Sequence, residues 1–217
     1  MINLKERPAA RMKLIGGRLC LDFVNTVGGW KRDPGGEANG LFDMVARADK
    51  LVDYLDLPAW GQHTGMLSEN EAQALARLAR RRVREAAATL RRAVALRGAI
   101  YRICIAIINR VEAPSSELDL LNRELNIAHD RLRLGAGTEN FVWEWIKNGL
   151  DQVLWRIAYS AAEMLTTDDL SRLRECPGDN CGWLFLDTSK NSRRQWCDMQ
   201  TCGNLAKVRR FRRRQSS

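Results

Sequence analysis

The stretch that decides the C-terminal fold is CPGDNC, residues 176–181, with its counterpart CDMQTC, residues 197–202. Each segment places two cysteines five positions apart, and fifteen residues separate the two segments. Two cysteine pairs that flank a short hairpin can direct four sulfurs at one tetrahedral ion. The spacing therefore predicts one structural zinc ion, with the ligands Cys176, Cys181, Cys197 and Cys202.

Two other uses of these cysteines are open, because loops of four residues are less diagnostic of zinc than loops of two. The alternatives are iron and a redox-active disulfide. A catalytic zinc ion is not expected, since four sulfurs complete the tetrahedron and leave no position for water. Cys20 and Cys104 lie in apolar stretches outside the quartet, and we expect both to be buried structural thiols.

The residues between the cysteine pairs predict a small hairpin. Residues 183–186 (WLFL) have the pattern of a strand, and Gln195-Trp196 would be the strand that returns to the second pair. We expect Trp183, Phe185 and Trp196 to form its apolar core. A module of about 40 residues buries too little surface to fold alone. A metal worth roughly 10 kcal/mol would supply the missing stability, so this end should unfold without it.

Positive charge is concentrated at the same end of the chain. Residues 188–217 hold nine Lys or Arg and one acid, Asp198, which is +8 of the formal +9 of the whole protein. A basic balance confined to one small module is typical of nucleic-acid binders. The residues expected to contact DNA are Lys190, Arg193, Arg194, Lys207, Arg209, Arg210, Arg212, Arg213 and Arg214.

Residues 203–214 predict a helix directly after the last cysteine. Leu205, Val208 and Phe211 would form a narrow apolar stripe along it. We expect this stripe to pack back on the zinc hairpin and to hold the basic residues against phosphates. About six phosphate contacts would give a slope of log affinity against log salt near −5. A tail that only increases solubility is the alternative.

Most of the preceding chain predicts helices. Apolar residues recur at helical spacing from Phe42 to Leu57, where Pro58 should stop the helix. Residues 68–71 (SENE) fit a capping box and open a helical stretch that reaches about Arg110, as one helix or two. The residues expected on the core face of its second half are Leu90, Val94, Arg97, Tyr101, Cys104, Ile105 and Ile108.

Further helices are expected after Pro114 and near the end of this region. Ser115 or Ser116 should cap a helix that runs to about His129, and residues 150–165 form a last amphipathic helix. Between them, residues 131–145 alternate with period two, which predicts an exposed hairpin on the bundle.

The expected fold is mainly α. A helical N-terminal domain with a small β-hairpin would span residues 1–169, in which residues 28–40 form a glycine-rich surface loop. A C-terminal zinc module with four cysteine ligands, a β-hairpin followed by a basic helix, would span residues 170–217.

The helical region holds two further groups of polar residues. Asp22, Asn25 and Thr26 interrupt an apolar segment, so they are a candidate effector pocket, although we favour a role in capping and pinning that segment. The second group is an arginine cluster that is either another nucleic-acid surface or, as we prefer, a solvated face. Its members are Arg77, Arg80, Arg81, Arg82, Arg84, Arg91 and Arg92.

Composition excludes several classes of protein. With 217 residues, 45% of them apolar, the chain can bury a proper core. The first twelve residues are polar, and the longest apolar run, residues 103–108, is too short to span a bilayer, so we expect a cytoplasmic protein without a membrane partner. His63 and His129 are isolated and fit no catalytic pattern, so we expect no catalytic residues and no enzyme.

Two segments resemble known families. Residues 193–197 (RRQWC) and 202–210 (CGNLAKVRR) resemble the CGNR zinc finger of bacterial proteins, named for its Cys-Gly-Asn-Arg motif. Residues 16–27 (GGRLCLDFVNTV) resemble the opening of the ABATE domain, the helical region that usually precedes this finger. The resemblance implies that the four C-terminal cysteines bind zinc and that the finger binds DNA. Leu205 replaces the naming arginine, and Arg209 or Arg210 is expected to compensate for that charge.

The residues and the resemblance together predict a zinc-dependent DNA-binding protein, a transcription regulator of bacterial type. Its helical domain would sense a small effector or form a homodimer on paired half-sites. Two alternatives are a protein-interaction adaptor that docks on an acidic surface, and an RNA binder that stacks bases on Trp183 and Trp196.

Overall fold

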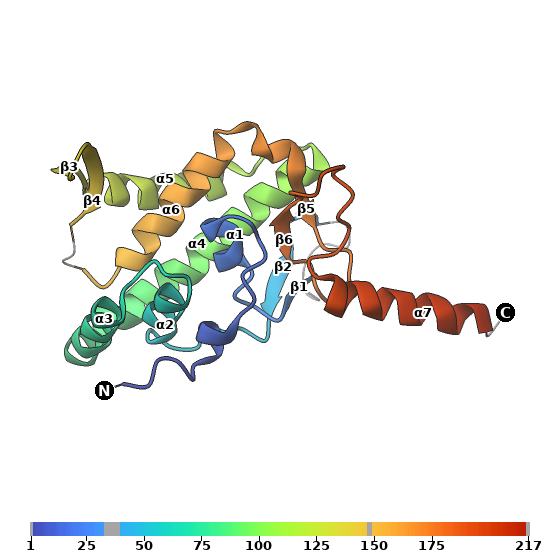
Figure 1. The fold of residues 1–217 in the computed structure, drawn as a ribbon, viewed down its shortest axis with the longest axis horizontal. Helices are drawn as coiled ribbons and strands as arrows, with labels where there is room; N and C mark the ends of the chain where they lie inside the picture. Colours follow the sequence, from blue (N-terminus) through green and yellow to red (C-terminus); the bar gives the residue numbers. More distant parts are fainter. Residues whose placement is uncertain (1, 33–39, 147–148, 216–217) are drawn as a thin grey trace.

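The computed structural model describes residues 2–32, 40–146 and 149–215. A bundle of α-helices forms the body, and small antiparallel hairpins are attached to it (Figure 1). The mainly α fold is therefore confirmed. The helices are α1 (Leu19–Val24), α2 (Asp56–His63), α3 (Glu69–Arg81), α4 (Val83–Asn109), α5 (Ser115–His129), α6 (Gln152–Leu165) and α7 (Asn204–Gln215).

Each sheet of the described residues has two antiparallel strands. The strands are β1 (Gly29–Arg32) with β2 (Met44–Arg47), β3 (Leu132–Ala136) with β4 (Phe141–Trp145), and β5 (Leu173–Glu175) with β6 (Leu184–Leu186). Short helical turns cover Pro8–Arg11, Asp168–Arg172 and Met199–Gly203, the last with π-helical hydrogen bonding.

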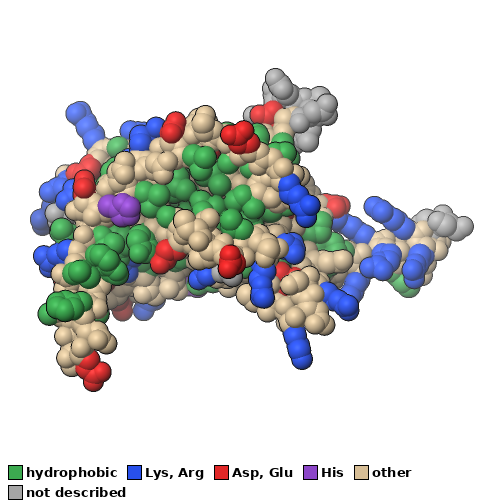
Figure 2. All heavy atoms as spheres, turned by 90° about the horizontal axis from the view of Figure 1, so that it is seen from above, with side chains coloured by type: hydrophobic (Ala, Val, Ile, Leu, Met, Phe, Trp, Pro, Cys, Tyr) green, Lys and Arg blue, Asp and Glu red, His purple; other side chains and the backbone are tan. Residues whose placement is uncertain are grey.

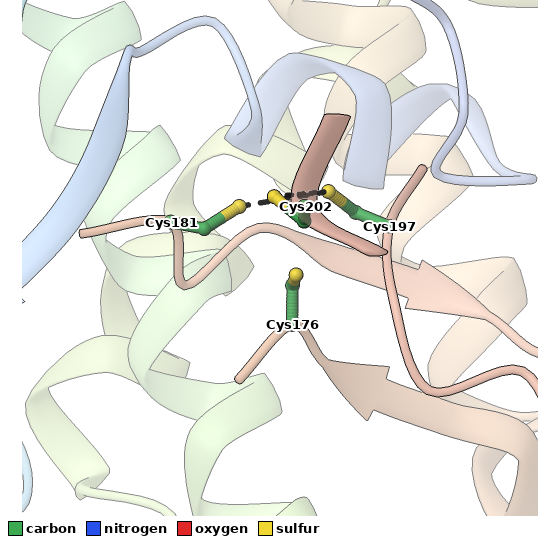
Figure 3. A group of neighbouring side chains, drawn as sticks. All are labelled: Cys176, Cys181, Cys197 and Cys202. Atoms are coloured by element: carbon green, nitrogen blue, oxygen red, sulfur yellow. Dashed lines mark hydrogen bonds between the residues drawn. The ribbon is translucent and has the colours of Figure 1, made fainter. Parts of the chain in front are cut away.

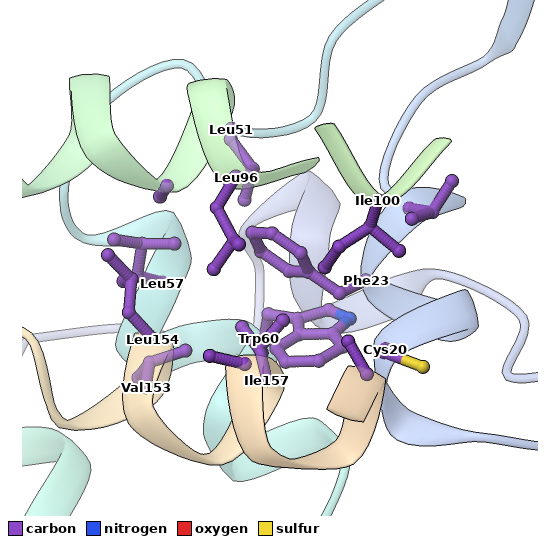
Figure 4. Close-up of a cluster of buried hydrophobic side chains, with 14 of the residues drawn as sticks. Cys20, Phe23, Leu51, Leu57, Trp60, Leu96, Ile100, Val153, Leu154 and Ile157 are labelled. Carbon is purple, nitrogen blue, oxygen red and sulfur yellow. The ribbon is translucent and has the colours of Figure 1, made fainter. Parts of the chain in front are cut away.

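Helix α4 runs through the middle of the bundle, and α1, α3, α5 and α6 pack against it (Figure 1). Phe23 meets Trp60 edge to face, with ring centroids 5.2 Å apart, in the centre of the buried cluster (Figure 4). Cys20 and Cys104 are fully buried, as expected, and burial raises the pKa of Cys20 to about 12. Both therefore behave as apolar core residues rather than reactive thiols.

The capping box at Ser68 is confirmed. The Ser68 hydroxyl accepts a hydrogen bond from the Glu71 amide, and the Glu71 carboxylate accepts one from the Ser68 amide. The long helical stretch is two helices, because Arg82 leaves the helical conformation with φ −124° and ψ 57°. On α4, Arg97, Tyr101, Cys104 and Ile105 are buried as expected, but Val94 is exposed because Ala93 and Leu96 face the core.

The expectation of a helix from Phe42 to Leu57 is wrong. Residues 44–47 form strand β2, which pairs with β1 inside the segment predicted to be a surface loop. Pro58 lies in the first turn of α2, where proline is tolerated because the amide there has no intrahelical partner. Residues 33–39 of the predicted loop lie outside the described residues. Helix α5 begins after Pro114, without a side-chain cap from either serine.

The cysteine-rich hairpin also differs from the expectation. Strand β6 pairs with β5, which precedes Cys176, and residues 195–196 form no strand. The first cysteine loop is therefore the turn of this hairpin, closed by a hydrogen bond from the Cys176 amide to the Trp183 carbonyl. Three apolar positions on β5 and β6, Leu173, Leu184 and Leu186, are buried in the same cluster as the helical core.

Among the described residues, we find no helix with the length and apolar character needed to cross a bilayer.

Candidate metal centre and basic helix

Four sulfur atoms converge at the boundary between the body and α7. Cys176 follows β5, Cys181 precedes β6, Cys197 lies in the following loop, and Cys202 lies in the turn that leads into α7. Their Sγ atoms all lie within 4.8 Å of one another and point toward a common centre (Figure 3). The spacing in the sequence therefore identified the four side chains that the fold brings together.

The sulfur geometry fits a tetrahedral zinc ion. A Zn–S bond of about 2.3 Å in a tetrahedron places sulfurs about 3.8 Å apart. Sγ of Cys181 lies 3.5 Å from Sγ of Cys197, which lies 3.6 Å from Sγ of Cys202. All four cysteines are free thiols, and these separations are much longer than an S–S bond of about 2.0 Å. The donor set is therefore suited to a metal ion rather than to a disulfide.

The ionisation of the four cysteines depends on whether a cation is bound. Hydrogen bonds from Cys181 and Cys197 lower the pKa of Cys176 to about 2, and amide groups of Cys197 and Gly178 act in the same direction. The hydrogen bond to Cys176 then raises the pKa of Cys181 to about 12. The chain by itself thus favours a thiolate at Cys176 and disfavours one at Cys181. A bound dication would allow all four to ionise.

The first cysteine loop is shaped by residues with special backbone freedom. Asn180 has a positive φ of 68°, which asparagine tolerates better than most residues. A Cβ atom on Gly178 would lie 3.1 Å from Sγ of Cys202 and 3.2 Å from Cβ of Cys181. A larger residue at Gly178 would crowd the sulfurs, so the loop depends on glycine at this point.

Asp198 positions the second cysteine pair. Its side chain accepts a hydrogen bond of 2.8 Å from the Gln200 amide, and its carbonyl accepts one from the Gly203 amide. Lys13, from the N-terminal segment, pairs with the same carboxylate and lowers its pKa. The turn that carries Cys202 is thus tied to the other end of the chain.

Asp187 and Arg194 hold the loop between the cysteine pairs. Asp187 accepts hydrogen bonds from Ser189 and from the Arg194 amide, and the bond from Ser189 contributes most to lowering its pKa. The Arg194 guanidinium lies 4.3 Å from the centre of the Phe185 ring and donates to the carbonyl groups of Trp196 and Cys197. Arg194, one of the expected DNA contacts, therefore already binds the finger's own backbone.

Asn25 anchors the hairpin in the helical body. Its side-chain amide donates to the Leu184 carbonyl at 2.8 Å, and its side-chain oxygen accepts from the Leu184 amide at 2.9 Å. Both residues are fully buried. The Asn25 side chain therefore pairs with β6 in the way that a neighbouring strand would.

Three more hydrogen bonds join the two parts. The Trp183 indole donates to the Val27 carbonyl at 3.0 Å, and the Tyr101 hydroxyl donates to the Glu175 carboxylate at 3.1 Å. The Trp30 amide donates to the Cys181 carbonyl at 2.8 Å. A residue of the cysteine quartet thus receives a backbone contact from β1 of the helical region.

Gly29 permits that contact. It has a φ of 150°, and a Cβ atom built there would lie 2.0 Å from the Asn180 carbonyl oxygen. Only a residue without a side chain lets β1 approach the cysteine loop this closely. This role could not be predicted from the sequence, because no local pattern connects Gly29 with the cysteine loop at residues 176–181.

The candidate effector residues are used by the chain itself. The Asp22 carboxylate accepts from the Gly16 amide, and burial raises its pKa. The Thr26 hydroxyl donates to the Phe23 carbonyl and accepts from the buried Arg97. With Asn25 paired to Leu184, these contacts are those of the capping and pinning role. Binding of an effector by these residues stays a prediction.

Helix α7 projects away from the body beyond the metal site (Figure 1). Leu205, Val208 and Phe211 are 58%, 46% and 62% exposed, and α7 has no buried residue. The expectation that this stripe packs on the zinc hairpin is therefore wrong. These three apolar residues, spaced three positions apart, form only a narrow stripe on the helix. The rest of the helix surface is basic, so the stripe offers too little apolar area to hold α7 against the hairpin.

Basic side chains project from the outer part of α7 on the face that Figure 2 shows. Lys207, Arg210 and Arg214 are exposed, whereas Arg209 forms an ion pair with Asp179 of the first cysteine loop. A groove of about 300 Å³ separates that loop from α7, with Arg209, Arg210 and Arg213 along its wall. Lys190 and Arg193 are exposed on the loop between the cysteine pairs.

Three aromatic residues of the finger, Trp183, Phe185 and Trp196, have a structural role. Phe185 is fully buried among the cysteines, and Trp183 and Trp196 pack against this small cluster while partly exposed. The small apolar core was thus predicted correctly. Since the Trp183 ring packs against both the helical core and the cysteine cluster, it offers little area for base stacking.

The arginine cluster on α3 and α4 has mixed roles. Arg92 binds Glu124 and Asp151 with three hydrogen bonds, so it links three elements of the bundle. Arg77, Arg80, Arg81 and Arg84 lie on the outer surface of these helices, mostly exposed.

Comparison with known families covers nearly the whole chain. Residues 17–168 match the profile of the ABATE family, described as "Putative stress-induced transcription regulator". Residues 172–215 match the CGNR zinc finger. No curated protein matches the chain. Both resemblances noted in the sequence are therefore confirmed. The first match ends at the start of the turn Asp168–Arg172, and the second begins at its end.

Proposed function

We propose that this chain, which belongs to the ABATE family and ends in a CGNR zinc finger, is a transcription regulator that binds DNA through α7. In this proposal one structural zinc ion fixes the start of α7, and the helical body holds the finger in place. The observation that carries the proposal is the position of α7, an exposed basic helix that begins two residues after a zinc-type ligand, Cys202.

The metal would supply folding energy rather than chemistry. Cys176, Cys181, Cys197 and Cys202 would hold it, and four thiolates leave no coordination position for water or substrate. Neutralising these thiolates removes the repulsion that disfavours the closed arrangement of sulfurs. Cys202 would then stay at one place on the body, and α7 would leave from a defined point.

The charge of α7 suits the backbone of nucleic acid. It carries six Lys or Arg residues and no Asp or Glu. Arginine forks match phosphate oxygens and guanine edges, and an isolated helix of this diameter fits the major groove of duplex DNA. Like-charged side chains on one helix repel each other, so phosphates that lie between them would also stabilise the helix.

The first experiment tests the dependence on zinc. We expect about one zinc ion per wild-type chain and partial or no zinc in Cys197→Ser, because three ligands hold a structural ion poorly. Retention of pooled random duplex DNA should be lost together with the metal. A metal-free wild type, or undiminished DNA binding by the metal-free variant, would contradict the proposal.

The second experiment locates the DNA contacts. We expect the triple variant Lys207→Gln, Arg210→Gln and Arg214→Gln to flatten the slope of log affinity against log salt by about 2 to 3. The matched control removes the same charge elsewhere, with Arg77→Gln, Arg81→Gln and Arg84→Gln. It should leave the slope unchanged. If the slope flattens equally in both triple variants, the arginine cluster of α3 and α4 is part of the DNA interface as well.

Competition separates the proposed function from that of an RNA binder. Binding to a labelled duplex that survives an excess of unrelated duplex indicates a sequence preference, as expected of a regulator. Stronger competition by single-stranded RNA than by duplex DNA would favour the RNA binder.

A further inference from the structure

The β3–β4 hairpin stands out from the end of the molecule opposite α7 (Figure 1). It is anchored at its base, where the Trp145 ring stacks on Trp155 at 6.3 Å and meets Tyr159 edge to face at 5.9 Å. The Ile146 amide also donates to the Arg131 carbonyl. The outer part of the hairpin is therefore presented on a fixed support.

One face of this hairpin is apolar along its whole length. Leu134 pairs with Trp143 and Ala136 with Phe141, so these side chains share a face. Phe141 is 78% exposed, Leu134 61% and Trp143 60%. The charged residues, Arg133 and Glu144, pair with each other on the opposite face. Hydrophobic side chains are also seen gathered over this end of the molecule in Figure 2.

We infer that the β3–β4 hairpin is a self-association arm, whose apolar face packs against the same face of a second copy of this chain. The inference goes beyond DNA binding and does not depend on it. It explains why a two-stranded hairpin, which is marginal alone in water, exposes two large aromatic side chains.

Charge favours a second copy as the partner. The apolar face carries no charged side chain, so an identical face meets no repulsion there, whereas an acidic or basic partner gains nothing from it. The exposed apolar stripe on α7 is different, because six Lys or Arg residues surround it and two copies would repel each other. Self-association is therefore expected at the hairpin end, which leaves both α7 helices accessible.

The available area predicts a dimer of modest affinity. Since an aromatic side chain offers about 150–250 Å², the exposed parts of Phe141, Trp143 and Leu134 amount to roughly 400 Å². A stable interface buries about 800 Å² per partner. The arm supplies about half of that area, and we expect a dissociation constant in the micromolar range.

The test is sedimentation of the zinc-loaded full chain in reducing buffer without DNA, over roughly 1 to 200 µM. We expect a monomer–dimer equilibrium in the wild type. The double variant Phe141→Ser and Trp143→Ser should weaken it at least tenfold. Since both side chains are exposed, the melting temperature should change little, and a single Phe141→Arg change provides a second variant that adds a repelling charge.

Two controls assign the interface. Val142→Ser alters the opposite face of the hairpin, and Phe211→Ser alters the exposed stripe of α7; both should retain the dimer. A wild type that is monomeric over the whole range would overturn the inference. So would a dimer that survives both hairpin variants, or one that dissociates with Phe211→Ser. If the hairpin binds a different molecule instead of a second copy, the wild type will be monomeric over the whole concentration range, and the inference is overturned.

Discussion

The two halves of the zinc finger are held in opposite ways. Leu184 and Phe185 of β6 are fully buried and belong to apolar clusters, whereas Val208 and Phe211 of α7 are about half exposed or more. Both halves lie within the single match to residues 172–215. One finger therefore combines an embedded hairpin with a helix that has no buried residue.

The difference assigns separate tasks to the halves. The β5–β6 hairpin is fixed to the body through Asn25, Trp30 and Tyr101, which bind residues of the hairpin and of its cysteine loop by direct hydrogen bonds. Helix α7 is joined to that unit through Cys202 and the pair between Arg209 and Asp179. The cysteine quartet is thus the junction between an anchored part and an accessible part.

The largest contrast is expected for one aromatic residue in each half. Phe185→Ala should lower the free energy of unfolding by about 3–5 kcal/mol, because it empties a buried site. Phe211→Ala should change it by less than about 0.5 kcal/mol, because the ring is exposed. Urea denaturation of both variants measures the difference. Similar losses would mean that α7 packs in solution after all.

Breaking the anchor should have the next largest effect. Asn25→Ala leaves the buried amide and carbonyl of Leu184 without the Asn25 partner, and each lost partner costs about 1–3 kcal/mol. We expect a lower free energy of unfolding and faster zinc transfer to a chelator. Asn109→Ala is the matched control, because that amide binds the Ile105 carbonyl within α4 itself. Equal zinc transfer in the two variants would show that the anchor does not support the metal site.

The smallest of these effects tests the approach of β1 to the cysteine loop. Gly29→Ala should displace β1 from Asn180 and speed zinc transfer several-fold, because the added Cβ meets the Asn180 carbonyl oxygen. Gly65→Ala is the control, since Gly65 also has a positive φ, of 73°, but no atom lies within 4 Å of its Cβ position. It should cost about 1 kcal/mol of backbone strain and leave zinc transfer unchanged.

Local patterns predicted the parts of the fold that depend on neighbours in the chain. The spacing of the cysteines identified the four converging sulfurs, and the capping box at Ser68 identified the start of α3. The alternation over residues 131–145 identified the β3–β4 hairpin. In each case the contacts that matter lie within the segment or recur at a regular interval.

Predictions failed where two conformations were both compatible with the local pattern. Residues 44–47 can follow helical spacing, but pairing with β1 made them a strand, and Pro58 suits a first helical turn as well as a helix end. Strand β6 could have paired with residues 195–196, but β5 is joined to it directly through the first cysteine loop. Only long-range packing distinguishes such options.

The sequence by itself determined that the chain is mainly helical, that its last four cysteines come together at one place, and that its charge is concentrated around and beyond them. Periodicity, ligand spacing and charge are properties of the chain order, so they need no coordinates. The tertiary structure decided that the finger shares the core of the body while α7 does not. Burial depends on which distant surfaces meet, and Asn25 and Gly29 acquire their roles only where β6 and the cysteine loop lie against them.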